Sequence, residues 1–328
     1  MNLKIKEYNK SYEMNIGNIT QILGSNFKIK NFIYNSLCRH FSLYKYQDYD
    51  EYMEDNILID QVVPGRKEYK LIDIQNREKL IELIKLTKNS LVWEYIQKML
   101  ETLVCQKQLN LIDENLTNIY FMINEKLKEN KCDISLDYDL QNLFSIVSKS
   151  EIYTTAGDEI ETLDNYSLLK IFLNLLKENN KFSNEKVLVL ISNIDHLCTK
   201  KEYNDICRYL QNYDRRIYTL FFISTDDYVH IDEAIMNNII VINDCFFQVP
   251  EYDILEEYLL NNYPINQEFS KIEMMNLLKR VLNKVGIERD FHSYQDLLVK
   301  KLINKAICVN DYYDFNMKNS EFVCLNSN

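Results

Sequence analysis

The chain has 328 residues, a formal net charge of −11, and only five Gly and three Pro. This length allows one large domain with additions or two domains, and the scarcity of helix breakers favours a mostly helical protein with one sheet. The acidic balance argues against a general nucleic-acid coat but leaves room for a local basic surface.

The eight cysteines are scattered along the chain without any C-x-x-C pair. No apolar run is long enough to span a bilayer, and the start of the chain lacks the pattern of a signal peptide. We therefore expect reduced thiols, and neither disulfides nor zinc, in a soluble cytoplasmic protein without a membrane partner.

The first elements predict a strand, a glycine turn and a helix. Apolar and basic residues alternate over 2–7, which indicates a half-buried edge strand. A second strand is expected at 18–23; it stops at Gly24, and a helix should run over 27–42. Strand, glycine turn and helix in this order are the context of a phosphate-binding loop.

The loop departs from the functional motif, which is Gly, four residues, Gly, Lys, and Ser or Thr. Lys30 is in register after Gly24, but Ile29 replaces the second glycine and Asn31 replaces the hydroxyl. A β-branched residue obstructs the backbone N–H groups that should close round phosphate, and an amide is a poor Mg²⁺ ligand. The sequence predicts a degenerate nucleotide loop at Gly24, Lys30 and Asn31, without ATP hydrolysis.

Charge is segregated near the N-terminus. Residues 1–47 hold seven Lys and Arg against two Glu, whereas 48–60 hold six acidic residues and no basic one. A solvated face accounts for the acidic run. The basic segment is the better place to look for a binding surface.

The next segment predicts a helical arm. A strand is expected at 69–74, followed by one long helix over 77–107. Asp113 should open another helix over 114–129, and a third should follow over 137–149. Long antiparallel helices between sheet strands would project as an arm from the sheet domain.

The central strand is the clearest element. Val187–Ile191 is an unbroken apolar run with polar residues on both sides, which is typical of a strand buried on both faces of a parallel sheet. A helix over 163–179 leads into it, and further strands are expected at 218–223 and 238–243. A capping box at Thr199 starts a helix over 200–213 between them.

No catalytic constellation follows these strands. An active NTPase would carry Asp-Glu after the central strand, and here Ser192 and Asn193 follow it. Asp195 and His196 are adjacent on what we expect to be an extended segment, so their side chains should point apart. Acidic residues and His show no spacing suited to two metals. We expect no enzyme.

Pro250 marks a boundary. Helices are expected over 253–262, 270–285 and 293–307, with a polar tail from 312. The predicted fold class is α/β: a degenerate P-loop-NTPase-like head with a mainly parallel sheet, an inserted long-helix arm and a helical C-terminal extension. The predicted domains are a discontinuous head at 1–76 and 150–248, an arm at 77–149, the extension at 249–311 and the tail at 312–328.

This layout over residues 2–244 resembles the CRISPR-associated Csn2 family of type II-A adaptation operons, in its longer subtype with a helical C-terminal extension. Besides the order of the elements, three phrases carry the resemblance: QLNLIDE at 108–114, VLVLISN at 187–193 and LCTKKE at 197–202. None of them is a catalytic signature.

The resemblance implies an NTPase-like head without hydrolytic activity and a helical leg. It also implies a ring-shaped homotetramer whose lysine-lined hole accommodates linear double-stranded DNA. The resemblance further implies that the ring binds free DNA ends and slides inward along the duplex. The implied partners are the CRISPR integrase complex and the RNA-guided nuclease, with which the protein supports spacer acquisition.

The resemblance implies no cofactor for catalysis. Short-subtype members hold calcium as a structural ion with acidic residues near the leg, and Asp113 and Glu114 fall on that region here. Gln106 and Gln108 stand where further carboxylates would be expected.

A ring would concentrate a modest basic patch of each subunit into its hole while acidic outer faces keep it soluble. Contacts from Lys and Arg to phosphate are independent of base sequence and sensitive to salt. The candidate DNA-binding residues are Lys28, Lys30 and Arg39 by the degenerate loop, Lys126, Lys128 and Lys131 at the basic end of the arm, and Lys279, Arg280 and Lys284 in the extension.

Two alternatives stay open. An ATP-driven enzyme of the clamp-loader or recombination type would bind nucleotide through Lys30, but the missing second glycine and the missing Asp-Glu pair count against it. A purely structural interaction protein would show no affinity for DNA at low salt.

Overall fold

The computed structural model describes residues 1–42, 46, 52–132, 134–137, 147, 150–213, 216–225, 227–264, 269–287 and 293–309. The chain divides into two compact units, which we call the sheet unit (Met1–Asn76 and Asn184–Asn328) and the helical unit (Arg77–Ser183). Residues 150–183 therefore group with the helices, whereas the sequence suggested that they belong to the head. The tail at 312–328 lies outside the described residues.

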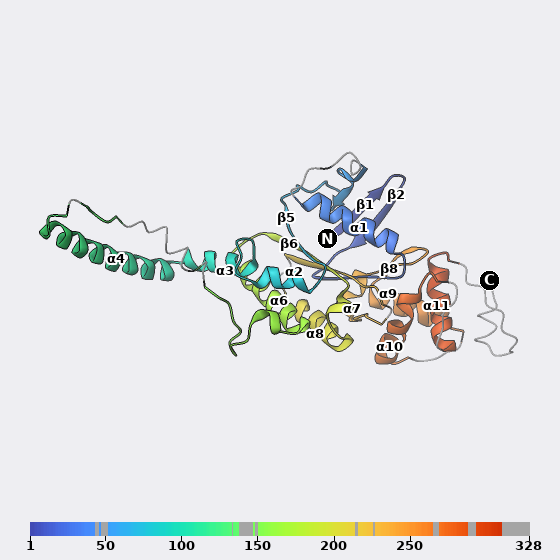
Figure 1. Ribbon diagram of the computed structural model, residues 1–328. Helices are drawn as coiled ribbons and strands as arrows, with labels where there is room; N and C mark the ends of the chain where they lie inside the picture. The colour runs from blue at the N-terminus through green and yellow to red at the C-terminus, as the bar shows by residue number, and fades with distance from the viewer. Residues whose placement is uncertain are drawn as a thin grey trace. The chain divides into compact units, whose positions relative to one another are not determined.

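The sheet unit is built on a six-stranded sheet in the order β5-β6-β7-β3-β8-β9 (Figure 1). Its first five strands are parallel and the last pair, β8 and β9, is antiparallel. The mainly parallel sheet expected from the sequence is confirmed. The strands are β3 (Ile19–Leu23), β5 (Tyr69–Ile74), β6 (Lys186–Ser192), β7 (Ile217–Phe222), β8 (Ile239–Ile242) and β9 (Phe246–Gln248).

The predicted central strand is β6, which pairs with β5 on one side and β7 on the other. All residues from Val187 to Ile191 are buried. Such a strand cannot alternate polar and apolar residues, because helices or a second sheet cover both of its faces.

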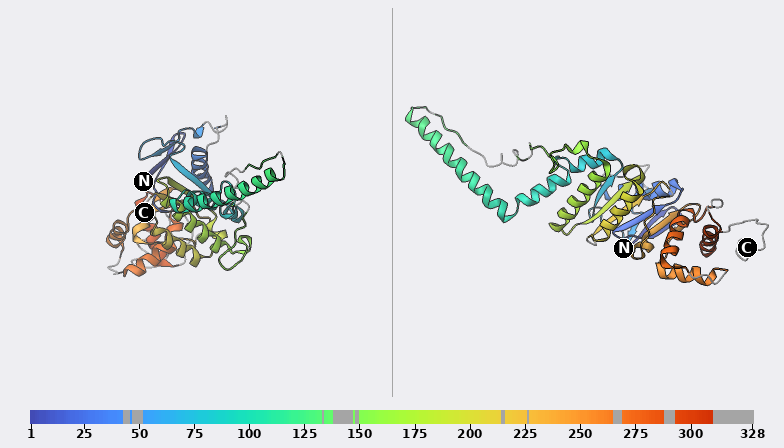
Figure 2. Two further views of the ribbon diagram at one scale, coloured as in Figure 1. Left: turned by 90° about the vertical axis from the view of Figure 1, so that its left-hand side faces the viewer. Right: turned by 90° about the horizontal axis from the view of Figure 1, so that it is seen from below.

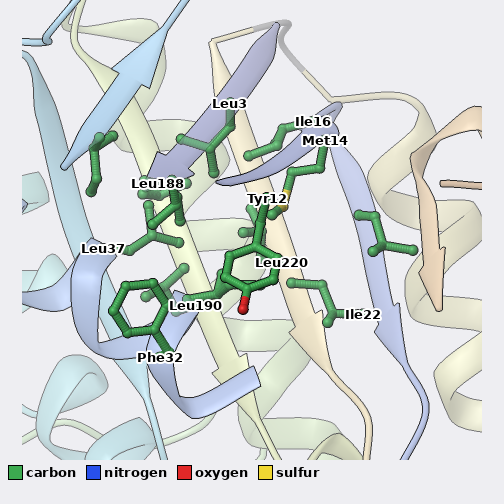
Figure 3. Packing of buried hydrophobic residues seen from close by; sticks show 14 of the residues in the cluster. Leu3, Tyr12, Met14, Ile16, Ile22, Phe32, Leu37, Leu188, Leu190 and Leu220 are labelled. Atoms are coloured by element: carbon green, nitrogen blue, oxygen red, sulfur yellow. The ribbon is translucent and has the colours of Figure 1, made fainter. Parts of the chain in front are cut away.

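A small antiparallel sheet in the order β2-β1-β4 covers part of one face of the main sheet. The strands are β1 (Asn2–Glu7), β2 (Lys10–Asn15) and β4 (Ile57–Ile59). The prediction of an edge strand at 2–7 was wrong in position, because β1 is paired on both sides. Figure 3 shows Leu3, Tyr12 and Met14 of this sheet packed against Leu188 and Leu220 of the main sheet.

Helix α1 (Phe27–Phe41) contributes Phe32 and Leu37 to the same core (Figure 3). Helix α8 (Lys200–Gln211) lies on the opposite face, where the Tyr203 hydroxyl donates to Gln21 Oε1 of β3 at 2.9 Å. The predicted capping box at Thr199 is present. Between β6 and α8, Asn193 leads into the short helix α7 (Ile194–Leu197), so the expectation of an extended segment at 195–196 was wrong.

The C-terminal part of the sheet unit is helical, as predicted. Its elements are the 3₁₀ turn η3 (Glu233–Asn238), α9 (Tyr252–Asn262), α10 (Lys271–Val281), the 3₁₀ turn η4 (Leu282–Lys284) and α11 (Tyr294–Ala306). A capping box at Ser270 starts α10.

The helical unit contains η2 (Ile160–Thr162), α2 (Arg77–Ile84), α3 (Leu91–Leu100), α4 (Leu103–Glu129) and α6 (Asn165–Lys181). The expected single helix over 77–107 is three pieces, because Ser90 caps α3 by accepting from Trp93 N–H at 3.0 Å and Thr102 is extended. The break expected at Asp113 is absent, since α4 runs through it. The helix expected over 137–149 falls largely outside the described residues.

None of the helices in the described part of the chain has both the length and the apolar character needed to cross a membrane.

Candidate functional site

The loop between β3 and α1 begins at Gly24, which has a φ of +96°. A Cβ at this position would lie 2.3 Å from Ile242 O and 2.8 Å from Asn243 Oδ1. Only glycine combines this left-handed backbone with so close an approach to β8. The loop is therefore pressed against the end of the neighbouring strand.

The backbone N–H donors of this loop are hydrogen-bonded to acceptors within the protein. Ser25 N–H donates to Asn243 Oδ1 at 2.6 Å, and Asn26 N–H donates to Ile242 O at 3.0 Å. Ile29 N–H donates to the side chain of Asn26, the N-cap of α1, at 3.2 Å. In a phosphate-binding loop such N–H groups point at the anion.

Lys30 is also turned inward. Its side chain is buried, with 3% of its surface exposed, and Nζ donates to Gly24 O and Ile223 O, each at 2.6 Å. The ammonium thus ties the loop to the end of β7. This corrects the expectation that Lys30 contacts DNA, because a buried ammonium held by two carbonyls is not presented to a phosphate.

A cavity of about 410 Å³ lies beside Lys30 at the carboxyl ends of β6 and β7. Asn31 lines it together with Ser192 and Asn193, which occupy the positions of the missing Asp-Glu pair. Ser224 Oγ donates to Asn193 Oδ1 at 3.2 Å. The described lining offers amides and hydroxyls, and none of its residues is a carboxylate that could hold Mg²⁺ or activate water.

Tyr34 closes one side of this cavity. Its hydroxyl donates to Asp73 and accepts from Gln75 Nε2 at 3.0 Å. Burial, followed by the hydrogen bond to Asp73, raises the pKa of Tyr34 far above its usual value, so the phenol stays protonated. The Asp73 carboxylate is therefore already hydrogen-bonded by two neutral donors, since Gln75 Nε2 also donates to it at 2.7 Å.

The other basic candidates of α1 lie apart. Lys28 is exposed at the start of the helix, and Arg39 is half-buried at its end. A separation of 11 residues puts their backbones about 16 Å apart along the helix axis. With Lys30 buried between them, the structure does not bring these three cations into one patch.

The basic end of α4 does gather its candidates. Lys126 and Lys128 are exposed in the last turn of the helix, and Lys131 is exposed just after its C-cap, Asn130. Lys126 pairs with Glu129 at 2.6 Å, whereas Lys128 and Lys131 have no carboxylate partner among the described residues. This is the densest of the three predicted basic clusters.

The cluster of the extension has one buried member, Lys284, and two exposed members, Lys279 and Arg280. Arg280 donates from Nη2 to Asp296 Oδ1 at 2.8 Å and from Nε at 3.0 Å, and Lys284 is buried. Only Lys279 projects from α10 as an exposed cation without a carboxylate partner in the part of the chain that the structure describes. The burial of Lys284 corrects its assignment as a DNA contact, whereas Arg280 is exposed and its assignment stays a prediction.

Among the described residues, the two calcium candidates are not joined by further ligands into a metal site. Asp113 and Glu114 are consecutive residues in the middle of α4, so their side chains leave the helix about 100° apart. No group of three or more His, Cys, Asp or Glu suited to a metal occurs among the described residues. Ca²⁺ takes six to eight oxygen ligands, which this pair cannot supply.

A feature of α4 that sequence periodicity missed is its exposure. No residue of this helix is buried, although many are apolar. Figures 1 and 2 show α4 running away from the other helices of its unit. The exposed large apolar side chains are Leu103, Val104, Leu111, Ile112, Ile119, Phe121, Met122 and Ile123.

The sequence matches the family model described as CRISPR-associated protein Csn2 subfamily St over residues 5–316. The fold is similar to the crystal structure of Stu0660 of Streptococcus thermophilus, with a TM-score of 0.81, 22% sequence identity, and coverage of 98% of this chain and 99% of that chain. No curated protein sequence matches the chain. At this identity the structural likeness establishes the α/β fold alone.

Proposed function

Because the chain belongs to the CRISPR-associated Csn2 family, subfamily St, and is thereby a type II-A adaptation protein, we propose that it acts as a non-catalytic ring that binds double-stranded DNA ends during spacer acquisition. The observation that carries the non-catalytic part is the inward-turned Lys30. Its ammonium and the loop N–H groups of Ser25 and Asn26 are satisfied by protein acceptors. Opening this loop for a phosphate would break all four bonds.

The exposed apolar surface of α4 supports the assembly of a homotetramer. A 27-residue helix without one buried side chain is unusual in a stable monomer, since contiguous exposed apolar patches mark interaction sites. A copy of the same helix offers an apolar surface of the same kind. The head would then keep its fold while α4 joins subunits.

Exposed lysines without carboxylate partners support sequence-independent binding of DNA. Lys128 and Lys131 at the end of α4, and Lys28 at the start of α1, meet this description among the described residues. Such contacts neutralise phosphates without reading bases. The CRISPR integrase complex and the RNA-guided nuclease are the protein partners that we propose for the DNA-bound ring.

A gel-shift comparison of linear and covalently closed circular duplexes of one sequence tests this function. We expect several copies to load on the linear DNA and little binding to the circle at moderate salt, because a closed ring enters only from an end. Parallel lanes with and without calcium test whether the ion is needed. Equal binding to both forms would indicate an open surface, and binding to neither would favour a structural interaction protein.

A further inference from the structure

The hairpin between β1 and β2 carries one end of a column of three nearly parallel aromatic rings. Tyr8 stacks on Tyr52 with ring centroids 5.7 Å apart and planes 9° apart. Tyr52 stacks on Phe32 at 6.4 Å and 16°. Phe32 is buried in the core, whereas 81% of the Tyr8 surface is exposed. The column therefore starts in the core and ends with an aromatic face in solvent.

The backbone of Tyr8 is strained at this position. Its φ is +50° in the turn that joins Glu7 to Lys10. Hairpin turns that need a positive φ favour Gly, Asn or Asp, and a bulky side chain there is uncommon. Strain of this kind gathers at functional sites. The exposed ring is held in place where a smaller residue would suit the turn better.

Two lysines accompany the ring. Tyr8, Lys10 and Lys28 line a cavity of about 440 Å³ at the start of α1. Both lysines are exposed, and neither has a carboxylate partner in the described ranges of the chain. Glu7 also lines the cavity, but its Oε2 accepts from the Tyr12 hydroxyl at 2.7 Å. Glu7 keeps its negative charge when it accepts this bond, so two lysines against one glutamate leave the lining with a net positive charge beside an exposed aromatic face.

An aromatic face with lysines at its edge is the chemistry that binds an unpaired nucleotide, whose base stacks on the ring while its phosphate meets the cations. The interior of a duplex cannot use it, because each base is already stacked between neighbours. We propose that Tyr8, with Lys10 and Lys28, binds an unpaired nucleotide at the end of DNA, as in a single-stranded overhang. The proposal rests on the DNA-end function above and specifies the kind of end.

Three DNA probes separate stacking from charge: a blunt duplex, the same duplex with a short single-stranded overhang, and the same duplex with an abasic overhang. With the full-length protein, fluorescence polarisation should show the overhang probe binding about tenfold tighter than the other two, which lies within the range of one base–aromatic stack. The abasic probe carries the same phosphates, so it isolates the contribution of the base.

The Tyr8→Gly variant removes the ring and also suits the left-handed turn, so it should fold at least as well as the parent chain. We expect it to lose the preference for the overhang while blunt-duplex binding stays the same. Tyr8→Trp should keep the preference. Tyr153→Ala, at an exposed tyrosine of the helical unit, is the matched control. It should change neither the preference for the overhang nor the affinity for the blunt duplex.

Equal affinity for the three probes, or an unchanged preference in Tyr8→Gly, would overturn the proposal while leaving blunt-duplex binding to stand. Absence of binding to all three probes would overturn both this proposal and the DNA function on which it rests.

Discussion

At the scale of single residues, Lys30 stands where the sequence motif would put a nucleotide-binding lysine, and it has the contacts of a structural one. A lysine that serves a nucleotide needs an ammonium free to meet phosphate oxygens. Here the Lys30 ammonium donates to Gly24 O and Ile223 O, and the loop N–H group of Ser25 donates to the side chain of Asn243. The same atoms that would bind a ligand therefore close the loop on the sheet.

Substituting Lys30→Met should destabilise the fold by about 2 kcal/mol or more, because two buried carbonyls lose their donor. Chemical denaturation of both proteins measures the difference. Lys28→Met on the exposed face of α1 is the matched control, for which we expect a change within about 0.5 kcal/mol. ATP turnover in the parent chain that disappears in a well-folded Lys30→Met variant would instead support the ATP-driven enzyme.

His40 should make stability depend on pH. Burial lowers its pKa from the usual value near 6.5, and one ring nitrogen, Nε2, lies 2.8 Å from Pro64 O. The unfolded chain therefore binds a proton at a higher pH than the folded chain does, so stability is full above about pH 6.5 and falls as the pH drops toward the folded-state pKa. His230, whose pKa burial also lowers, acts in the same direction.

Melting temperatures at pH 7.5 and pH 5.5 check this dependence. His40→Gln should show a smaller loss on acidification than the parent chain, since Gln does not titrate in this range. His196→Gln, at an exposed position, should leave the loss unchanged. An identical loss in all three proteins would assign the pH dependence to other groups.

At the scale of elements, α4 differs from every other long helix of the described chain because none of its residues is buried. A helix of 27 residues in water gains most of its stability from packing of an apolar face rather than from intrinsic propensity. The side chains of Phe121 and Met122 near its C-terminal end are exposed in the part of the chain that the structure describes. Contact with a second copy would give α4 an apolar surface to pack against.

The double substitution Phe121→Glu and Met122→Glu should shift the protein from the proposed tetramer to smaller species in light scattering. The physical reason is that carboxylates placed in an apolar interface lose solvation without gaining a partner. Thr117→Glu with Asn118→Glu, two exposed polar positions on the same helix, gives the control for added charge. An unchanged mass for the Phe121 and Met122 variant would place the subunit contact elsewhere.

At the scale of the whole molecule, a net charge of −11 is compatible with DNA binding if the cations face one side. Lys128 lies at the end of the exposed helix and Lys131 just after it, and neither has a carboxylate partner among the described residues. Four copies would bring eight such lysines to one duplex in the proposed ring. Phosphate neutralisation would then be a property of the assembly more than of the subunit.

The salt dependence of DNA binding measures how many phosphates the lysines neutralise. If these eight lysines each neutralise one phosphate, the slope of log K against log salt should be about −7, because each neutralised phosphate contributes about −0.9. Lys128→Ala with Lys131→Ala should move the slope toward zero at an unchanged oligomeric mass. Lys279→Ala in the extension serves as a comparison. A larger change of the slope in this variant would indicate that the DNA contacts α10 instead.

Much of the sheet followed from sequence because its signals are local. The apolar run of Val187–Ile191 and the capping boxes at Thr199 and Ser270 each lie within a few consecutive residues, so they predict a strand and two helix starts without knowledge of the fold. The departures from the nucleotide motif at Ile29 and Asn31 were equally visible. These observations determined the fold class and the expectation of a loop that no longer serves catalysis.

Other features were decided only by the tertiary structure, because they depend on contacts between distant parts of the chain. Ser25 meets Asn243 across 218 residues, and Lys30 meets Ile223 across 193, so no local pattern marks the lysine as buried. The exposure of α4 is equally invisible, because a stripe of apolar residues has the same period whether it faces a core or a second subunit. The column beginning at Tyr8 joins rings from three separate elements, and only folding places them in one stack.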